Sequence, residues 1–177
     1  MDGLERIFNM MSESFGKFIV IAELGKKEAA AKKVVASNID ILVVLQDLLK
    51  DEYLQRDLYE SHRYILFGVD GITVMEHFEE HLIEEMKHAS ILQRYIVSLG
   101  GTPTIERHVI PHIEKGNFKE LLKINLKHER AAVEKYCIAI KVIEEMDNIL
   151  HAALINDLEG IVSEESEHSQ DIESWLK

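Results

Sequence analysis

The stretch His81-Leu82-Ile83-Glu84-Glu85-Met86-Lys87-His88 contains a Glu-x-x-His pair, Glu85 and His88. The same pair recurs near the end of the sequence as Glu165 and His168. Residues three apart on a helix project from one face, so each pair can present a carboxylate and an imidazole to one metal ion. Two such pairs on separate helices supply part of the ligand set of a di-iron or di-manganese carboxylate site inside a four-helix bundle.

The remaining ligands of such a site are one inward Glu from each of the other two helices. Helical periodicity predicts a helix from about residue 37 to residue 67, and Glu52 falls on its apolar stripe between Leu49 and Tyr59. A buried carboxylate is costly unless a cation or hydrogen bonds satisfy it. Glu52 is therefore a candidate ligand, and the competing interpretation is a Glu at the edge of the stripe that reaches solvent.

Periodicity predicts three further helices, over residues 72–99, residues 118–146 and the segment after Asp147-Asn148. Each also carries one Glu on its inward stripe: Glu85, Glu129 and Glu165. Glu52 and Glu85 are 33 residues apart, and Glu129 and Glu165 are 36 apart, which indicates a duplicated helical hairpin. Four buried carboxylates without a cation would destabilise the core, so a metal site is favoured over coincidence.

The long connection over residues 100–116 contains both prolines and is long enough to run the length of the bundle. One long crossover is typical of the ferritin-like bundles. The predicted fold is therefore all-α, a ferritin-like four-helix bundle over residues 37–177. Residues 1–36 have apolar residues at helical spacing, interrupted by Gly16 and Gly25, and predict an extra N-terminal helical segment. This extension either packs on the bundle or a neighbouring subunit, or binds a surface or targets the protein.

The composition restricts the classes of function. The net charge is −12 and no basic tract stands out, which makes nucleic acid an unlikely partner and favours the attraction of cations. The single Cys137 excludes an internal disulfide and a four-cysteine iron site of the rubredoxin type. No apolar run reaches membrane-spanning length, and the first 25 residues lack the pattern of a signal peptide. We expect a cytoplasmic protein without membrane contact.

The run from Ile83 to Ala89 resembles the second-helix signature of bacterioferritins, and Tyr59 stands where they have a tyrosine beside the metals. Residues 38–177 thus resemble the ferritin-like superfamily, most closely bacterioferritins and Dps-like ferritins with a bacterioferritin-type di-iron site. The resemblance implies two Fe ions per subunit, with Mn or Zn as other metals of the same site. The residues that would hold them are Glu52 and His88 on one ion, Glu129 and His168 on the other, and Glu85 and Glu165 between the two.

The resemblance also implies an activity, that of a ferroxidase. It would oxidise Fe(II) to Fe(III) with O2 or H2O2 and store ferric mineral in a cage. Tyr59 would be a hydrogen-bond donor or electron source beside the irons, or else an ordinary core tyrosine. Met86 occupies the position of the haem-ligand methionine, although a packing methionine is the favoured interpretation. Glu80 and Glu84 would nucleate mineral or form a solvated acidic face, and His81 would contact metal or be structural.

Two other functions compete with iron storage. One is a non-storage di-iron or di-manganese redox enzyme, peroxidase-like or catalase-like, and the other is a structural or DNA-protecting helical assembly. The expected assembly is a homo-oligomer. Bacterioferritins with 24 subunits continue into a fifth helix, whereas this sequence stops nine residues after His168. We therefore expect a dodecamer in preference to a 24-mer.

Overall fold

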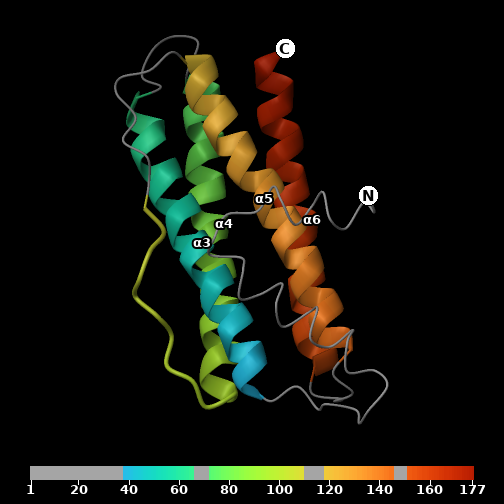
Figure 1. Ribbon diagram of the computed structural model, residues 1–177. Helices are drawn as coiled ribbons and strands as arrows, with labels where there is room; N and C mark the ends of the chain where they lie inside the picture. Colours follow the sequence, from blue (N-terminus) through green and yellow to red (C-terminus); the bar gives the residue numbers. More distant parts are fainter. Residues whose placement is uncertain (1–37, 66–71, 110–117, 146–150) are drawn as a thin grey trace.

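The computed structural model describes residues 38–65, 72–109, 118–145 and 151–177. The described residues form four long helices: α3 (Asn38–Ile65), α4 (Ile72–Ser98), α5 (Phe118–Glu144) and α6 (His151–Leu176). In Figure 1 the helices stand side by side as a bundle, α3 antiparallel to α4 and α5 antiparallel to α6. The predicted all-α four-helix architecture is confirmed, with helix ends within about two residues of those predicted.

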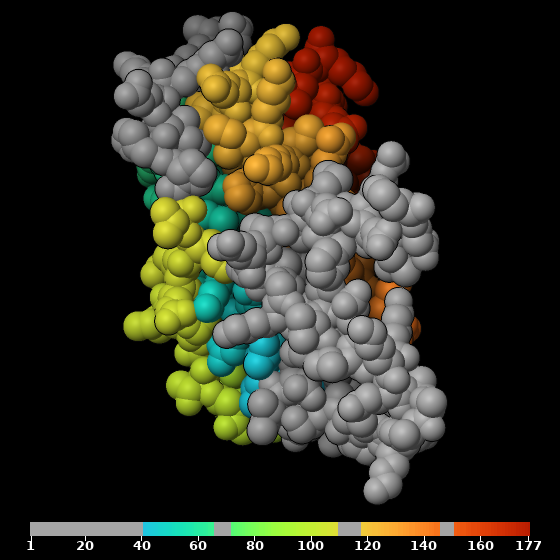
Figure 2. Space-filling view, in the orientation of Figure 1, coloured from blue at the N-terminus to red at the C-terminus, as the bar shows by residue number. Residues whose placement is uncertain are grey.

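The long connection between α4 and α5 begins as the sequence predicts. Gly100 adopts a positive φ of 85°, the left-handed conformation that ends helices and that glycine adopts without strain. A Cβ at Gly101 would lie 2.6 Å from the Leu42 side chain, so glycine there lets the connection approach α3 closely. Residues 102–109 then run along the outside of the bundle beside α3 (Figures 1 and 2).

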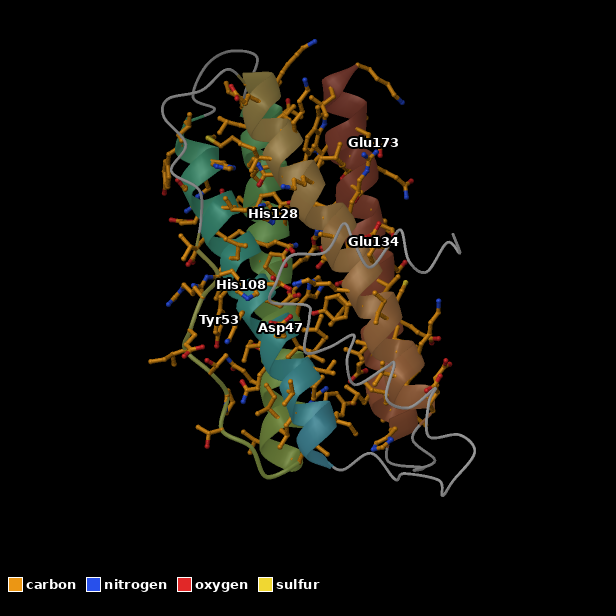
Figure 3. The ribbon with its side chains drawn as sticks, in the orientation of Figure 1. Asp47, Tyr53, His108, His128, Glu134 and Glu173 are labelled. Carbon is orange, nitrogen blue, oxygen red and sulfur yellow. The ribbon has the colours of Figure 1, made fainter. Side chains whose placement is uncertain are left out.

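Polar contacts hold this crossover against α3. The Gln46 amide donates to the Thr102 carbonyl oxygen at 2.7 Å and accepts from the Thr104 N–H at 2.8 Å. Farther along, His108 Nδ1 lies 2.7 Å from Asp51 Oδ1 and its ring faces Asp47 (Figure 3). The described part of the crossover therefore lies against α3 from Gln46 to Asp51.

The core of the bundle is divided along its length. One apolar cluster includes Leu45, Leu92 and Ile143, and a second includes Phe78, Leu122 and Ile172. Between them lies a buried layer of carboxylates and imidazoles. No helix in the described ranges is both long and apolar enough to cross a membrane. The predicted extension over residues 1–36 lies outside the described residues.

Candidate metal centre

The four inward carboxylates predicted from the sequence meet in one layer of the bundle. Glu52 comes from α3, Glu85 from α4, Glu129 from α5 and Glu165 from α6, and all four are buried. Helical periodicity placed each of them on the face that also carries the apolar core residues. The layer is completed by the two predicted histidines, both also buried: His88 and His168.

The first group of potential ligands surrounds Nδ1 of His88. This nitrogen lies 3.2 Å from Glu52 Oε2, 3.0 Å from Glu165 Oε1 and 3.6 Å from Glu85 Oε2. The ligand atoms that these four residues can offer lie within 4.8 Å of one another. One metal ion could be held among them after small side-chain adjustments.

The second group surrounds Nδ1 of His168. It lies 3.5 Å from Glu129 Oε2, 3.6 Å from Glu85 Oε1 and 3.8 Å from Glu165 Oε2. Glu85 and Glu165 thus belong to both groups, and each turns a different oxygen toward each histidine. Two ions held here would share these two carboxylates.

Several of these buried atoms have no hydrogen-bond partner among the described residues. They are Glu52 Oε2, Glu85 Oε2, Glu165 Oε1, His88 Nδ1 and His168 Nδ1. These atoms lie 3.0–3.8 Å from oppositely charged groups, as ion pairs without hydrogen bonds. An unpaired buried polar group costs about 1–3 kcal/mol. Carboxylate oxygens and imidazole nitrogens are ligands that suit Fe, Mn and Zn, so the residues fit a pair of cations.

The opposite nitrogen of each histidine ring is held by a carboxylate from the other hairpin. His88 Nε2 lies 2.6 Å from Glu164 Oε2, and His168 Nε2 lies 2.9 Å from Glu84 Oε2. Such partners fix the orientation of a ligating imidazole and leave its other nitrogen for the metal. Glu84, interpreted from the sequence as a mineral-nucleating or solvated residue, contacts His168, and Glu164 was not predicted.

Two tyrosines hold the two carboxylates that belong to only one group each. The Tyr59 hydroxyl donates to Glu129 Oε1, and the Tyr136 hydroxyl donates to Glu52 Oε1 at 2.5 Å. Burial, followed by the nearby carboxylates, raises the pKa of both tyrosines, so both remain neutral donors. Tyr136 was predicted only as a core residue. The sequence does mark this role of Tyr136: it follows Glu129 by seven residues, as Tyr59 follows Glu52.

Gln55 is a further residue that the sequence analysis missed. Its amide nitrogen donates to Glu165 Oε2 at 3.1 Å and lies 3.4 Å from both Glu85 Oε1 and Glu129 Oε2. The side chain is buried in the centre of the carboxylate layer. The sequence marks this role of Gln55 only by its position three residues after Glu52, on the same face of the helix.

Protons balance the charge of this layer when no metal is bound. Burial, followed by neighbouring carboxylates, raises the pKa of Glu52 and Glu129. Burial would also raise the pKa of Glu85, but its contacts with His168 and His88 outweigh burial and lower the pKa to about 2. Burial would lower the pKa of His168, but Glu129 and Glu85 raise it to about 12. Metal ions that bind here would displace protons.

Two other predicted candidates lie outside both groups. His81 is buried, and its ring stacks on the His168 ring with centroids 3.9 Å apart, but it belongs to neither ligand group. The Met86 side chain is 55% exposed on α4. Its role as a haem ligand therefore stays a prediction.

Known proteins resemble this chain in sequence and in structure. A family model described as the ferritin-like domain matches residues 43–177. A bacterial ferritin from Paramagnetospirillum magnetotacticum is 29% identical over 146 residues, which covers 82% of each chain. The bacterioferritin of Desulfovibrio desulfuricans superimposes with a TM-score of 0.71 at 24% identity, covering 78% of this chain and 79% of that one.

A second structural neighbour is a bacterioferritin-related protein from Bacteroides fragilis described as a dodecameric thioferritin. It has a TM-score of 0.70 at 24% identity and covers 80% of this chain and 87% of its own. At 24% identity the structural neighbours show that the fold is shared. The family model matches residues 43–177, most of the chain, and so shows the family. The resemblance predicted from the second-helix signature is confirmed, and the chain belongs to the ferritin-like family.

Proposed function

We propose that this protein is an iron-storage ferroxidase, which oxidises Fe(II) to Fe(III) at a dinuclear centre within the chain. The observation that carries the proposal is the pair of ligand groups that share Glu85 and Glu165. Membership of the ferritin-like family and the likeness to a bacterial ferritin support the same function.

The residues divide into three roles. Glu52 and His88 would hold one iron, Glu129 and His168 would hold the other, and Glu85 and Glu165 would bridge the two. Two irons at adjacent positions supply two electrons together, which reduces H2O2 to water or O2 to H2O2 with the uptake of two protons. Carboxylates stabilise the ferric product, and neutral imidazoles bind without adding charge.

The surrounding residues keep this arrangement ready for metal. Tyr59 and Tyr136 orient Glu129 and Glu52, and Glu84 and Glu164 orient the two imidazoles. Tyr59 would in addition be an electron source if an oxidation draws more than two electrons. The apolar clusters above and below exclude water from the layer.

Storage requires a closed shell, and we propose a homo-oligomeric cage with the dodecamer favoured over the 24-mer. The relative from Bacteroides fragilis is described as dodecameric, which supports this choice. The net charge of −12 per chain would draw Fe(II) toward the assembly. A haem held by Met86 from two subunits is a further proposal, and the exposure of Met86 supports it. An absorption spectrum of the protein as purified tests for haem.

A non-storage di-iron enzyme is the second candidate, because a structural neighbour from Bacillus anthracis is described as a ferritin-like di-iron carboxylate protein. Aerobic loading with rising amounts of Fe(II), followed by size-exclusion chromatography and iron analysis, separates the two. Storage predicts far more than two irons per chain in a large particle. Two irons per chain would support the non-storage enzyme, and no oxidation above the protein-free rate would contradict both.

A further inference from the structure

A third group of potential metal ligands lies beside the dinuclear centre. It consists of His77 and His81 on α4 and Asp171 on α6, whose ligand atoms lie within 4.8 Å of one another. His77 and His81 are four residues apart and therefore project from one face of the helix, one turn apart. None of the three belongs to the two groups built on His88 and His168.

His81 is the buried member of this group and lacks the partners that a buried imidazole needs. Its side chain is only 4% exposed, and Nδ1 has no hydrogen-bond partner in the described part of the chain. Nε2 lies 3.7 Å from Asp171 Oδ2, which is too long for a hydrogen bond. A purely structural His–Asp pair would be expected to close this gap.

The group is closed on one side and open on the other. The Trp175 ring packs 5.2 Å from the His77 ring and 6.2 Å from the His81 ring. The side chains of His77 and Asp171 are 39% and 49% exposed. An ion can therefore arrive from solvent at two half-exposed ligands and meet a third, His81, that is buried in the core.

We propose that His77, His81 and Asp171 form a third cation site, for a divalent transition-metal ion such as Fe(II), Co(II) or Zn(II). Two imidazoles and one carboxylate are a donor set that such ions bind with ligand bonds of about 2.0–2.2 Å. The ligand atoms must then approach to ~3.3 Å of one another, which follows from tetrahedral geometry at those lengths. The His77 and Asp171 side chains are half-exposed, so both have room to rotate toward His81.

The site has a consequence for iron movement, and this step rests on the proposed function. The His81 ring stacks on His168, the residue assigned to one of the two irons. A third ion at this place would be an immediate neighbour of the centre. Three protein ligands leave a fourth position for water. Fewer protein bonds then have to break when the ion leaves, so the site suits an ion in transit to or from the centre.

Metal titration of the metal-free, full-length protein tests the third site. Isothermal titration with Co(II), together with metal analysis after gel filtration, should give three ions per chain. His77→Gln and Asp171→Asn each remove one half-exposed ligand and should lose one ion, with at least a tenfold weaker third binding step. Glu173→Gln is the matched control, because Glu173 (Figure 3) is a carboxylate on the same helix, two residues from Asp171. Its side chain is 42% exposed and pairs with Arg130.

The outcomes are distinct. Two ions per chain in the wild-type protein, a third ion that persists in both variants, or an equal loss in Glu173→Gln would each overturn the third site. A Glu85→Ala variant should lose ions from the dinuclear centre and keep the ion that depends on His77. A wild-type protein that binds only the His77-dependent ion would support the third site and contradict the proposed dinuclear centre.

Discussion

The hairpin α3–α4 and the hairpin α5–α6 carry the same series of site residues in the same order. Each has a Glu, a Tyr seven residues later, a Glu-Glu pair on the next helix and a His three residues after that pair. The series are Glu52, Tyr59, Glu84, Glu85 and His88 in the first hairpin, and Glu129, Tyr136, Glu164, Glu165 and His168 in the second. Each hairpin also supplies the tyrosine and the outer carboxylate that hold ligands of the other.

The hairpins differ at several buried positions, and two of these lie against the residues of the dinuclear group. Gln55, three residues after Glu52, corresponds to Ala132 in the second hairpin, and His81, seven residues before His88, corresponds to Ile161. All four are buried. The common residues supply a symmetrical pair of ligand sets. In the first hairpin, Gln55 adds an amide to the carboxylate layer and His81 adds an imidazole beside it, so the two groups of candidate ligands have unequal surroundings.

The largest effect is expected where the hairpins share a ligand. Glu85→Ala or Glu165→Ala removes a carboxylate that faces both groups, so the rate of rapid Fe(II) oxidation should fall ~100-fold or more. The metal-free bundle should stay folded, because the loss of one carboxylate lowers the pKa of the facing imidazoles, which then become neutral by losing a proton. Stopped-flow absorbance of the ferric product measures the rate, and circular dichroism measures the fold. Unchanged initial rates in both variants would rule out the shared ligands.

The next test asks whether the two halves act as a unit. His88→Ala and His168→Ala should each lower metal occupancy at one position and abolish most of the rapid oxidation. The double variant should be little slower than either single one, because groups that act together give non-additive losses. Initial rates of the three variants decide the matter. Multiplicative losses would indicate two separate mononuclear sites.

A smaller effect is expected at the tyrosines, where the hairpins match. Tyr59→Phe and Tyr136→Phe each remove one hydrogen-bond donor to a carboxylate of the opposite hairpin. Each should weaken metal binding ~10-fold, the lower end of the range of effects for residues that hold a metal ligand in place. Isothermal titration with Co(II) compares the two variants. Similar affinities combined with much slower oxidation in Tyr59→Phe alone would indicate that Tyr59 supplies an electron. Full affinity in both would contradict the role of the hydrogen bonds.

The smallest effect is expected where the hairpins differ. Gln55→Ala removes the amide that donates into the carboxylate layer, so the metal-free protein should lose about 1–2 kcal/mol of stability. That corresponds to a melting temperature lower by roughly 2–8 °C for a chain of this size. The metal-loaded protein should lose less, because bound ions satisfy the same oxygens. Differential scanning calorimetry of both forms measures this, and equal losses would show that the amide plays no part in balancing the empty layer.

The fold and the convergence of the six candidate ligands in one buried layer could be predicted because both follow from helical periodicity. A carboxylate on an apolar stripe and a Glu-x-x-His pair are visible in sequence without knowledge of neighbouring helices. Tyr136, Gln55 and Glu164 were missed for a different reason. Their roles depend on where a side chain points across the bundle, and a tyrosine, an amide or a surface carboxylate at helical spacing is compatible with ordinary packing. Comparing the two hairpins position by position would have found Tyr136 and Glu164, but not Gln55, which has no polar counterpart.

Diffraction at the iron absorption edge from crystals soaked anaerobically in Fe(II) tests the central claim most directly. Two anomalous peaks should appear within the carboxylate layer, one beside Glu52 and His88 and the other beside Glu129 and His168. Glu85 and Glu165 should each contact both ions. A single peak in this layer, or iron bound only elsewhere, would contradict the dinuclear centre.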